Sequence, residues 1–183
     1  MDQSNRDILI LPGWGDSGPE HWQTQWQQKN PSYLCVIQRE WINVNPAEWI
    51  DTLDRCIQTC RKPVVLLAHS LSCTLVARWA ALGRNNVAAA FLVAPTDVER
   101  RETCPPETWC FAPIPRARLP FKSMVVASSS DPYTSLAKAA LLADHWGSQF
   151  VNIGDAGHIN VASGHGPWPE GEALLARLLE SKT

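Results

Sequence analysis

Ser70 is the residue whose type and setting most directly suggest chemistry. It follows a run of branched and aliphatic residues at 64–67 and precedes a helical pattern at 73–82. A serine on a sharp strand-to-helix turn raises its hydroxyl above a sheet, and the next amide, that of Leu71, points into the same space. This arrangement suits a nucleophile that attacks a carbonyl carbon, with the Leu71 N–H stabilising the oxygen that becomes negative.

The residues around Ser70 are small, as such a turn requires. The usual pattern has glycine two residues before and two residues after the serine, whereas this chain has Ala68 and Ser72. His69 adjoins the serine, but neighbours at a strand end point in opposite directions, so its ring is expected under the turn. The alternative interpretation is structural: Ser70 only caps the helix that follows.

A serine hydroxyl needs a base to accept its proton and an acid to orient that base. Two later strands, predicted at 124–127 and 150–153, run into loops that hold Asp131 and His158. The chain order is serine, aspartate, histidine, each directly after its own strand, which is one of the known orders of a Ser-His-Asp triad. We therefore predict that Ser70 is the nucleophile, His158 the base and Asp131 the orienting acid.

Other acids and histidines compete for these roles. Asp97 follows the intervening strand and is the alternative acid, although Asp131 lies in the better-defined turn. Asp155 lies three residues before the predicted base and is expected to shape its own turn through backbone contacts. His145 lies inside a helical pattern and His165 lies several residues beyond a strand end, so neither is preferred as the base.

A second backbone donor is needed to complete an oxyanion hole beside Leu71. The first predicted strand runs into a glycine-rich loop at 11–18, and glycine allows such a loop to approach the serine closely. The amide of Trp14 is the first choice for this donor, with Gly13 next. The alternative is an ordinary glycine turn between a strand and a helix.

The elements that must position these residues alternate along the chain. Strands are predicted at 8–11, 34–37, 64–67, 88–93, 124–127 and 150–153, without polar alternation, as in a parallel sheet buried on both faces. Helices are predicted at 19–28, 46–60, 70–82, 134–146 and 170–180. Right-handed crossovers give a three-layer α/β/α sandwich with a mainly parallel sheet, as one domain over residues 1–183, with functional groups at the carboxyl ends of the strands.

One stretch, at 96–120, breaks this alternation. It is rich in proline and lacks periodicity, so we expect an irregular excursion over the sheet edge that acts as a small lid or as a partner site. Gly13, Trp14, Trp109, His165 and Trp168 are the candidate substrate-binding residues. The aromatic ones among them would wall a pocket for an apolar or aromatic group, the alternative being that the tryptophans only hold loops against the core.

Composition limits the partners and the location. The chain of 183 residues has 16 basic and 18 acidic residues, a net charge of −2 without blocks of either sign, so nucleic acid is not an expected partner. Apolar runs are too short to cross a bilayer and the polar first residues lack the pattern of a secretory signal, so a cytoplasmic location is expected. Six cysteines without a CxxC pair are expected to be free thiols. No metal is expected; the alternative site would gather Asp16, Glu20 and His21.

Taken together, the motifs of this chain resemble a known family. The residues that carry the resemblance are Pro12-Gly13-Trp14-Gly15, His21-Trp22, Trp26, His69-Ser70-Leu71, Phe111-Ala112-Pro113-Ile114-Pro115, Ser130-Asp131-Pro132, Gly157-His158-Ile159-Asn160 and Gly166-Pro167-Trp168-Pro169. They are similar to the small serine-hydrolase family typified by retinoblastoma-binding protein nine, and more closely to its bacterial-type branch. The resemblance implies a compact intracellular α/β-hydrolase without a large lid domain, with Ser70, Asp131 and His158 as its triad. It also implies esterase-like or peptidase-like activity toward small acyl compounds, and protein binding in the animal member.

The predicted function is hydrolysis of a small ester or amide through an acyl-enzyme on Ser70, without a metal or organic cofactor. Esterase, peptidase and thioesterase activities stay open. The alternative from another class is a non-catalytic protein that keeps the scaffold and binds a partner protein through the stretch at 96–120.

Overall fold

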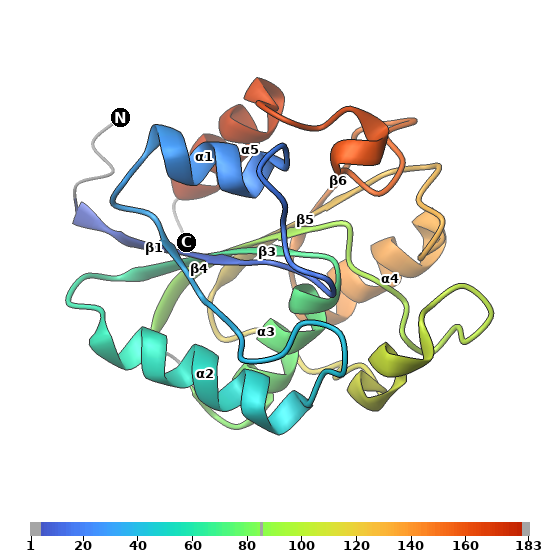
Figure 1. Cartoon of the computed structure of the whole chain (residues 1–183), viewed down its shortest axis with the longest axis horizontal. Helices are drawn as coiled ribbons and strands as arrows, with labels where there is room; N and C mark the ends of the chain where they lie inside the picture. The colour runs from blue at the N-terminus through green and yellow to red at the C-terminus, as the bar shows by residue number, and fades with distance from the viewer. Residues whose placement is uncertain (1–4, 85, 181–183) are drawn as a thin grey trace.

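Parallel pairing throughout the sheet places all its carboxyl ends along one edge. The computed structural model describes residues 5–84 and 86–180 (Figure 1). The strand order is β2-β1-β3-β4-β5-β6, and each neighbouring pair is parallel. The strands are β1 (Asp7–Leu11), β2 (Leu34–Cys35), β3 (Val64–His69), β4 (Val87–Val93), β5 (Lys122–Ala127) and β6 (Gln149–Asn152). The order reverses at β1, so the loops after β1 and β3 flank the point at which such sheets bind ligands.

Helices cover both faces of the sheet, with α1 and α5 on one side and α2 and α3 on the other (Figure 1). The helices are α1 (Trp22–Lys29), α2 (Pro46–Thr59), α3 (Leu71–Ala81), α4 (Leu136–Trp146) and α5 (Pro169–Glu180), with the 3₁₀ helices η2 (Pro106–Phe111) and η3 (Val161–Ser163). The predicted three-layer sandwich in a single domain is confirmed for the described residues. Residues 1–4, 85 and 181–183 of the predicted domain lie outside them.

The sheet has a separate apolar core on each face because both faces of its strands are apolar. Leu9 and Leu11 of β1 pack with α2 and α3, whereas Ile8 and Ile10 pack with α1 and α5. All six residues of β3 are buried. A strand that is buried on both sides reads as a continuous apolar run, which is why the parallel sheet could be predicted.

Local signals set where two of the helices begin. The Asn45 side chain accepts the Ala47 N–H and Pro46 opens α2, as predicted. Helix α1 begins at Trp22 rather than at residue 19, because His21 Nδ1 accepts the Gln23 N–H and caps the helix there. The predicted start was therefore three residues too early.

The stretch at 96–120 is irregular, as predicted, but it is packed against the domain. Phe111, Ile114 and Leu119 are buried in the core on the α3 side. Arg78 of α3 also donates to the carbonyls of Phe111 and Ala112, at 2.9 and 2.8 Å. These apolar side chains complete the core on the α3 side, while residues such as Arg100, Arg101 and Glu102 are exposed, so the stretch is exposed only in part. Its role as a lid or as a partner site stays a prediction.

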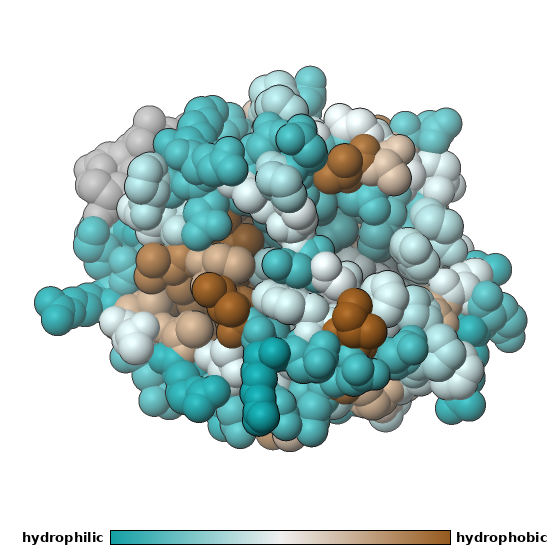
Figure 2. Space-filling view, in the orientation of Figure 1, coloured by the Kyte–Doolittle hydropathy of each residue, from teal (hydrophilic) through white to brown (hydrophobic). Residues whose placement is uncertain are grey.

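Exposed apolar side chains gather near the sheet edge formed by β2. Leu34 is 51% exposed and Ile37 73% exposed. Figure 2 shows apolar residues collected on this face over the segment that holds β2. Across the residues that the structure describes, no helix combines the length and the apolar character needed to cross a membrane.

Candidate active site

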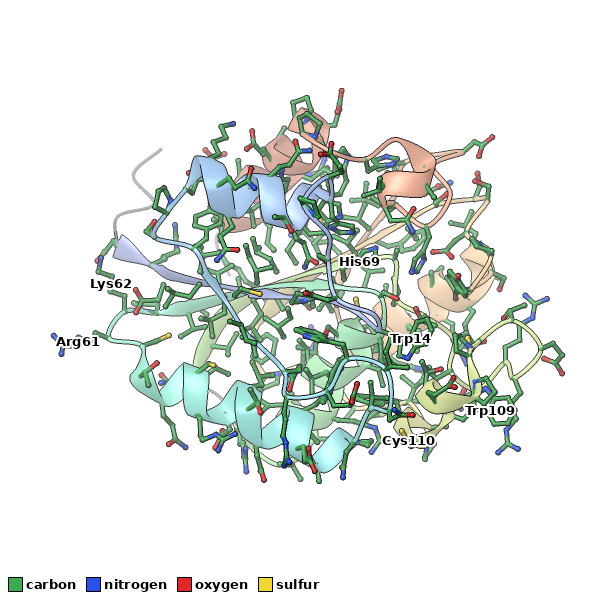
Figure 3. All side chains as sticks on the ribbon, viewed as in Figure 1. Trp14, Arg61, Lys62, His69, Trp109 and Cys110 are labelled. Carbon is green, nitrogen blue, oxygen red and sulfur yellow. The ribbon has the colours of Figure 1, made fainter. Side chains whose placement is uncertain are left out.

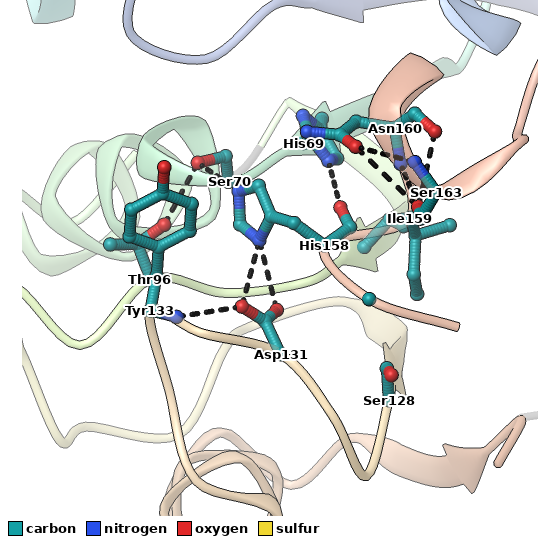
Figure 4. Close-up of polar contacts among 12 residues, drawn as sticks. His69, Ser70, Thr96, Ser128, Asp131, Tyr133, His158, Ile159, Asn160 and Ser163 are labelled. Atoms are coloured by element: carbon teal, nitrogen blue, oxygen red, sulfur yellow. Dashed lines mark hydrogen bonds and ion pairs between the residues drawn. The ribbon is translucent and has the colours of Figure 1, made fainter. Parts of the chain in front are cut away.

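The loops after β3, β5 and β6 bring Ser70, Asp131 and His158 together (Figure 4). His158 Nε2 lies 2.9 Å from Ser70 Oγ. On the other side of the ring, His158 Nδ1 lies 3.0 and 2.9 Å from the two carboxylate oxygens of Asp131. The carboxylate only accepts hydrogen bonds, so Nδ1 carries the proton and Nε2 is left free to accept the Ser70 hydroxyl proton. This connected line has the geometry of a Ser-His-Asp triad.

Ser70 stands on a strained turn, with φ 58° and ψ −124°. This backbone conformation is costly for a residue other than glycine and is held by the surrounding contacts. Its N–H donates to Val93 O of β4 at 2.9 Å. Ser70 occupies the N-cap position of α3 but its side chain makes no capping bond. The interpretation of Ser70 as a simple helix cap is therefore wrong, because its hydroxyl is turned toward His158.

Ser72 stands where glycine is usual, and its side chain forms a hydrogen bond that glycine could not form. It is 1% exposed, and its hydroxyl donates to Pro12 O at 2.5 Å. This bond ties the start of α3 to the loop after β1. The departure from the glycine pattern therefore adds a link between the two sides of the predicted oxyanion hole.

Hydrogen bonds join the loop that carries Asp131 to the loop that carries His158. Ser128 Oγ accepts the Ala156 N–H at 2.9 Å, and Ser130 Oγ accepts the Gly157 N–H at 3.0 Å. Ser130 Oγ also donates to Asp155 Oδ1. Asp155 was expected to bond the backbone of its own turn, but its carboxylate instead reaches the hydroxyl of the neighbouring loop. These bonds fix the spacing between Asp131, which directly follows Ser130, and His158, which directly follows Gly157.

Tyr133 supports both the acid and the base. Its N–H donates to Asp131 Oδ1 at 2.9 Å. Its ring packs edge-on against the His158 ring, with 4.6 Å between centroids. One residue thus holds the carboxylate by its backbone and limits movement of the imidazole by its side chain.

His69 points under the turn, as predicted, and it contacts the backbone of His158, the proposed base. Its Nε2 lies 2.9 Å from the His158 carbonyl oxygen, so this nitrogen must donate. Burial, followed by the nearby charges of His21 and His158, holds the pKa of His69 well below its usual value. Its ring also packs against that of His21, 4.8 Å away between centroids. His69 is therefore a neutral donor that holds the base loop, a partner that the sequence alone did not indicate.

The rival acid and bases lie elsewhere. Asp97 Oδ1 is 3.3 Å from Lys138 Nζ, in an ion-pair network with Glu99. His145 lies in α4. His165 Nδ1 is bonded to Ser163 Oγ at 3.1 Å, and burial lowers its pKa. Neither rival histidine contacts Ser70.

Gly13 brings the loop after β1 directly against the nucleophile. A Cβ added at Gly13 would lie 2.8 Å from Ser70 Cβ and 3.3 Å from Ser70 Oγ. Within the described part of the chain, the Trp14 N–H donates no backbone hydrogen bond, and Leu71 is the first residue of α3, where helical N–H groups lack partners. The two N–H groups chosen from the sequence thus have no backbone acceptor among the described residues.

A cavity of about 220 Å³ opens over Ser70 and His158. Its other walls include Trp14, Thr96, Pro105, Thr108, Tyr133 and Asn160. Thr96 and Tyr133 were not predicted as site residues, since neither residue type signals catalysis by itself. A wider depression of about 600 Å³ lies away from Ser70, between α1 and the start of α5.

Three of the residues predicted to wall the pocket do not do so. Trp168 is 6% exposed and stacks on Trp26 in the core between the sheet and helices α1 and α5. His165 packs edge-on against Trp168. Trp109 belongs to η2, where its Nε1 donates to Cys104 O at 3.0 Å and the Arg101 guanidinium carbon lies 4.9 Å from the ring centroid; Figure 3 shows it on a different segment from Trp14. Of the predicted aromatic walls, Trp14 lines the cavity. For Trp168 the packing matches the alternative interpretation, in which the tryptophan belongs to the core.

All six cysteines are free. Among the described residues, no three His, Cys, Asp or Glu side chains gather in a way that could hold a metal ion. His21, part of the alternative metal site, is instead 5% exposed and caps α1 through Nδ1.

The parallel sheet, the strained serine turn and the buried Ser70-His158-Asp131 line define an α/β-hydrolase. The model of the serine hydrolase family matches residues 8–177, and the chain belongs to that family. None of the curated proteins compared with this chain is significantly similar to it.

Solved structures support the same assignment. A YdeN-like hydrolase from Pectobacterium atrosepticum is 31% identical, with a TM-score of 0.88 over 97% of this chain and 92% of that chain. The ydeN gene product of B. subtilis is 18% identical, with a TM-score of 0.76 over 97% of this chain and all of that chain. Est1E from Butyrivibrio proteoclasticus is 13% identical, with a TM-score of 0.71 over 94% and 86% of the two chains. The last two similarities concern the fold alone.

Proposed function

We propose that this serine hydrolase cleaves a small ester or amide through an acyl-enzyme on Ser70. The observation that carries the proposal is the 2.9 Å contact between His158 Nε2 and Ser70 Oγ, on a ring oriented by Asp131. In the first step His158 takes the hydroxyl proton as Ser70 Oγ bonds to the carbonyl carbon, and it then gives that proton to the leaving group. Water, activated by His158, releases the acyl group in the second step. These steps need no metal or organic cofactor.

The main-chain N–H groups of Leu71 and Trp14 are proposed as the oxyanion hole. They flank Ser70 from α3 and from the loop after β1, and the close approach at Gly13 supports this pairing. Donors fixed before the reaction stabilise the tetrahedral oxygen because they need no reorganisation when its charge develops. Ser72 contributes by holding the two segments together through Pro12 O.

The cavity supports a small, uncharged acyl group as the substrate. Its volume of about 220 Å³ is below the range of about 300–1,000 Å³ of drug-sized ligand pockets. Apart from His158, the side chains that line it are not ionisable at neutral pH, and two of them, Trp14 and Tyr133, are aromatic. Esters, thioesters and amides of short or compact aromatic acids are the compounds to test.

We also propose that the chain belongs to the branch typified by retinoblastoma-binding protein nine. The motifs Gly13-Trp14 and Gly157-His158, which resemble the retinoblastoma-binding-protein-nine type, support it, since Trp14 and His158 line the cavity. We further propose a cytoplasmic location, which the six free thiols support because such thiols persist in reducing compartments.

A fluorophosphonate probe tests the nucleophile. Labelling of the wild type that disappears in Ser70→Ala is the expected result. Ser148→Ala is the matched control and should label normally. Ser148 lies just before β6, away from the cavity, and its Oγ is hydrogen-bonded to Ser123 Oγ. Absence of labelling in folded wild-type protein would refute the proposal and favour the non-catalytic binding alternative.

A further inference from the structure

The Ser70 hydroxyl has a second partner besides the histidine. Thr96 Oγ1 lies 2.8 Å from Ser70 Oγ, in the loop after β4 (Figure 4). Thr96 is 4% exposed and lines the same cavity. It belongs to neither the triad nor the proposed oxyanion hole, so its contact with the reacting oxygen needs a separate account.

The direction of this hydrogen bond follows from its neighbours. Asp131 accepts from His158 Nδ1, so His158 Nε2 must accept from the Ser70 hydroxyl. The single Ser70 proton is then committed to His158, and Ser70 Oγ can only accept from Thr96. We propose that Thr96 is a further catalytic residue, a hydroxyl donor that stabilises negative charge on Ser70 Oγ; this inference rests on the proposed hydrolase function.

The loop after β4 holds Thr96 firmly in this position. Ala94, two residues earlier, has φ 50°, and its N–H donates to Val126 O at 2.8 Å. Asp97, the residue after Thr96, donates its N–H to Tyr133 O at 3.1 Å, and its Oδ1 forms an ion pair with Lys138 Nζ at 3.3 Å. A strained backbone that is fixed on both sides is typical of positions that serve a site.

The donor acts at the same oxygen in both halves of the reaction. During attack, the Oγ–H bond breaks toward His158 while the Oγ–C bond forms, and Oγ carries negative charge in between. During deacylation, a water oxygen bonds to the acyl carbon and gives a proton to His158 Nε2; the C–Oγ bond then breaks and Oγ takes that proton back. A hydrogen bond to an ionised oxygen is stronger than one to a neutral oxygen, so Thr96 lowers both barriers.

This role differs from that of a residue that only shapes the pocket. Because the hydroxyl acts on Ser70 Oγ, its loss should slow all substrates by the same factor, whatever their acyl group. It should also slow fluorophosphonate labelling, which uses the same attack by Oγ. A pocket wall would instead change KM and alter the preference between short and bulky acyl groups.

The experiment compares Thr96→Val and Thr96→Ala, which lack the hydroxyl, with Thr96→Ser, which keeps it. We expect kcat and the labelling rate to fall by about 10- to 100-fold in the first two variants and to stay within about threefold of wild type in Thr96→Ser. The control is Thr74→Val in α3, an equally buried threonine whose hydroxyl has no partner among the described residues. It should retain wild-type rates.

Two results would overturn the role of Thr96. One is wild-type labelling and kcat in Thr96→Val, and the other is an equal loss in Thr96→Ser and Thr96→Ala, since these two differ by the hydroxyl alone. If Thr96→Val does not fold, the Ser and Ala pair decides the matter. Failure of the hydrolase proposal is distinguishable, because the wild type itself would then not label at Ser70.

Discussion

A single methyl group at Gly13 tests the architecture on which the proposed oxyanion hole depends. In Gly13→Ala the new Cβ would lie 2.8 Å from Ser70 Cβ, 3.2 Å from His69 O and 3.3 Å from Ser70 Oγ. Carbon atoms in favourable contact are about 3.5–4.0 Å apart, so the loop and the turn must separate by about 0.7 Å or more. We therefore expect this substitution to move Ser70, together with the Leu71 N–H, away from the proposed donor at Trp14.

Neither side can yield freely. The Ser70 N–H is bonded to Val93 O at 2.9 Å, and the loop is held through the Ser72 hydroxyl on Pro12 O at 2.5 Å. Overpacking of this kind costs about 1–3 kcal/mol of stability. A misplacement of about 1 Å at a reacting centre can cost about 100-fold in rate. The expected result is a folded protein whose kcat/KM is about 100-fold lower.

Two measurements are made: the rate of hydrolysis of a short-chain ester, and the free energy of unfolding in urea, monitored by tryptophan fluorescence. The control is Gly18→Ala in the same loop, where an added Cβ meets nothing within 4 Å. This variant should match the wild type in both measurements. Full activity in Gly13→Ala would show that the loop does not lie against Ser70 as described, and the choice of Trp14 as oxyanion donor would lose its support.

Three further predictions concern the aromatic and histidine side chains. Trp168→Ala should lower the free energy of unfolding by about 3–5 kcal/mol in urea titrations while leaving the activity per folded molecule unchanged, because Trp168 packs in the core. Trp14→Ala should instead change the turnover of bulky relative to short esters, because Trp14 walls the cavity. Burial lowers the pKa of His21 from 6.5 to about 4, so between these values the unfolded chain binds a proton that the native state excludes. Because of this proton, the free energy of unfolding is highest above about pH 6.5 and falls by about 3 kcal/mol toward pH 4. The variant His21→Asn keeps a capping acceptor, and its free energy of unfolding should fall by about 3 kcal/mol less over this pH range in urea titrations.

The assembly of the three central side chains was predictable because of the parallel sheet. Ser70, Asp131 and His158 each follow an apolar run, and parallel strands place such positions along one edge. Burial on both faces made those runs recognisable, while the ends of the elements depend on local caps such as His21. The sequence pattern therefore indicated which loops meet better than it indicated where each helix begins.

The remaining site residues depend on contacts between segments that no local pattern reports. Thr96 lies 26 positions from Ser70, and His69 bonds a carbonyl 89 positions away. Threonine and histidine occur widely in folded chains, so only their placement gives them a role here. The prediction of aromatic pocket walls was incomplete for a related reason. The same large side chain can fill a core or line a pocket, and composition does not distinguish Trp168 from Trp14.

A further regularity explains how the proposed catalytic groups are held in place. Side-chain or backbone hydrogen bonds join the loops after every neighbouring pair of strands from β1 to β6. The links are Ser72 to Pro12, Ser70 to Thr96, Asp97 to Tyr133, and Ser130 to Asp155. Each loop that carries a proposed functional group is thus bonded to at least one neighbouring loop. Because rigid support of the reacting groups matters more than the size of the scaffold, these links supply the preorganisation that the proposed chemistry requires.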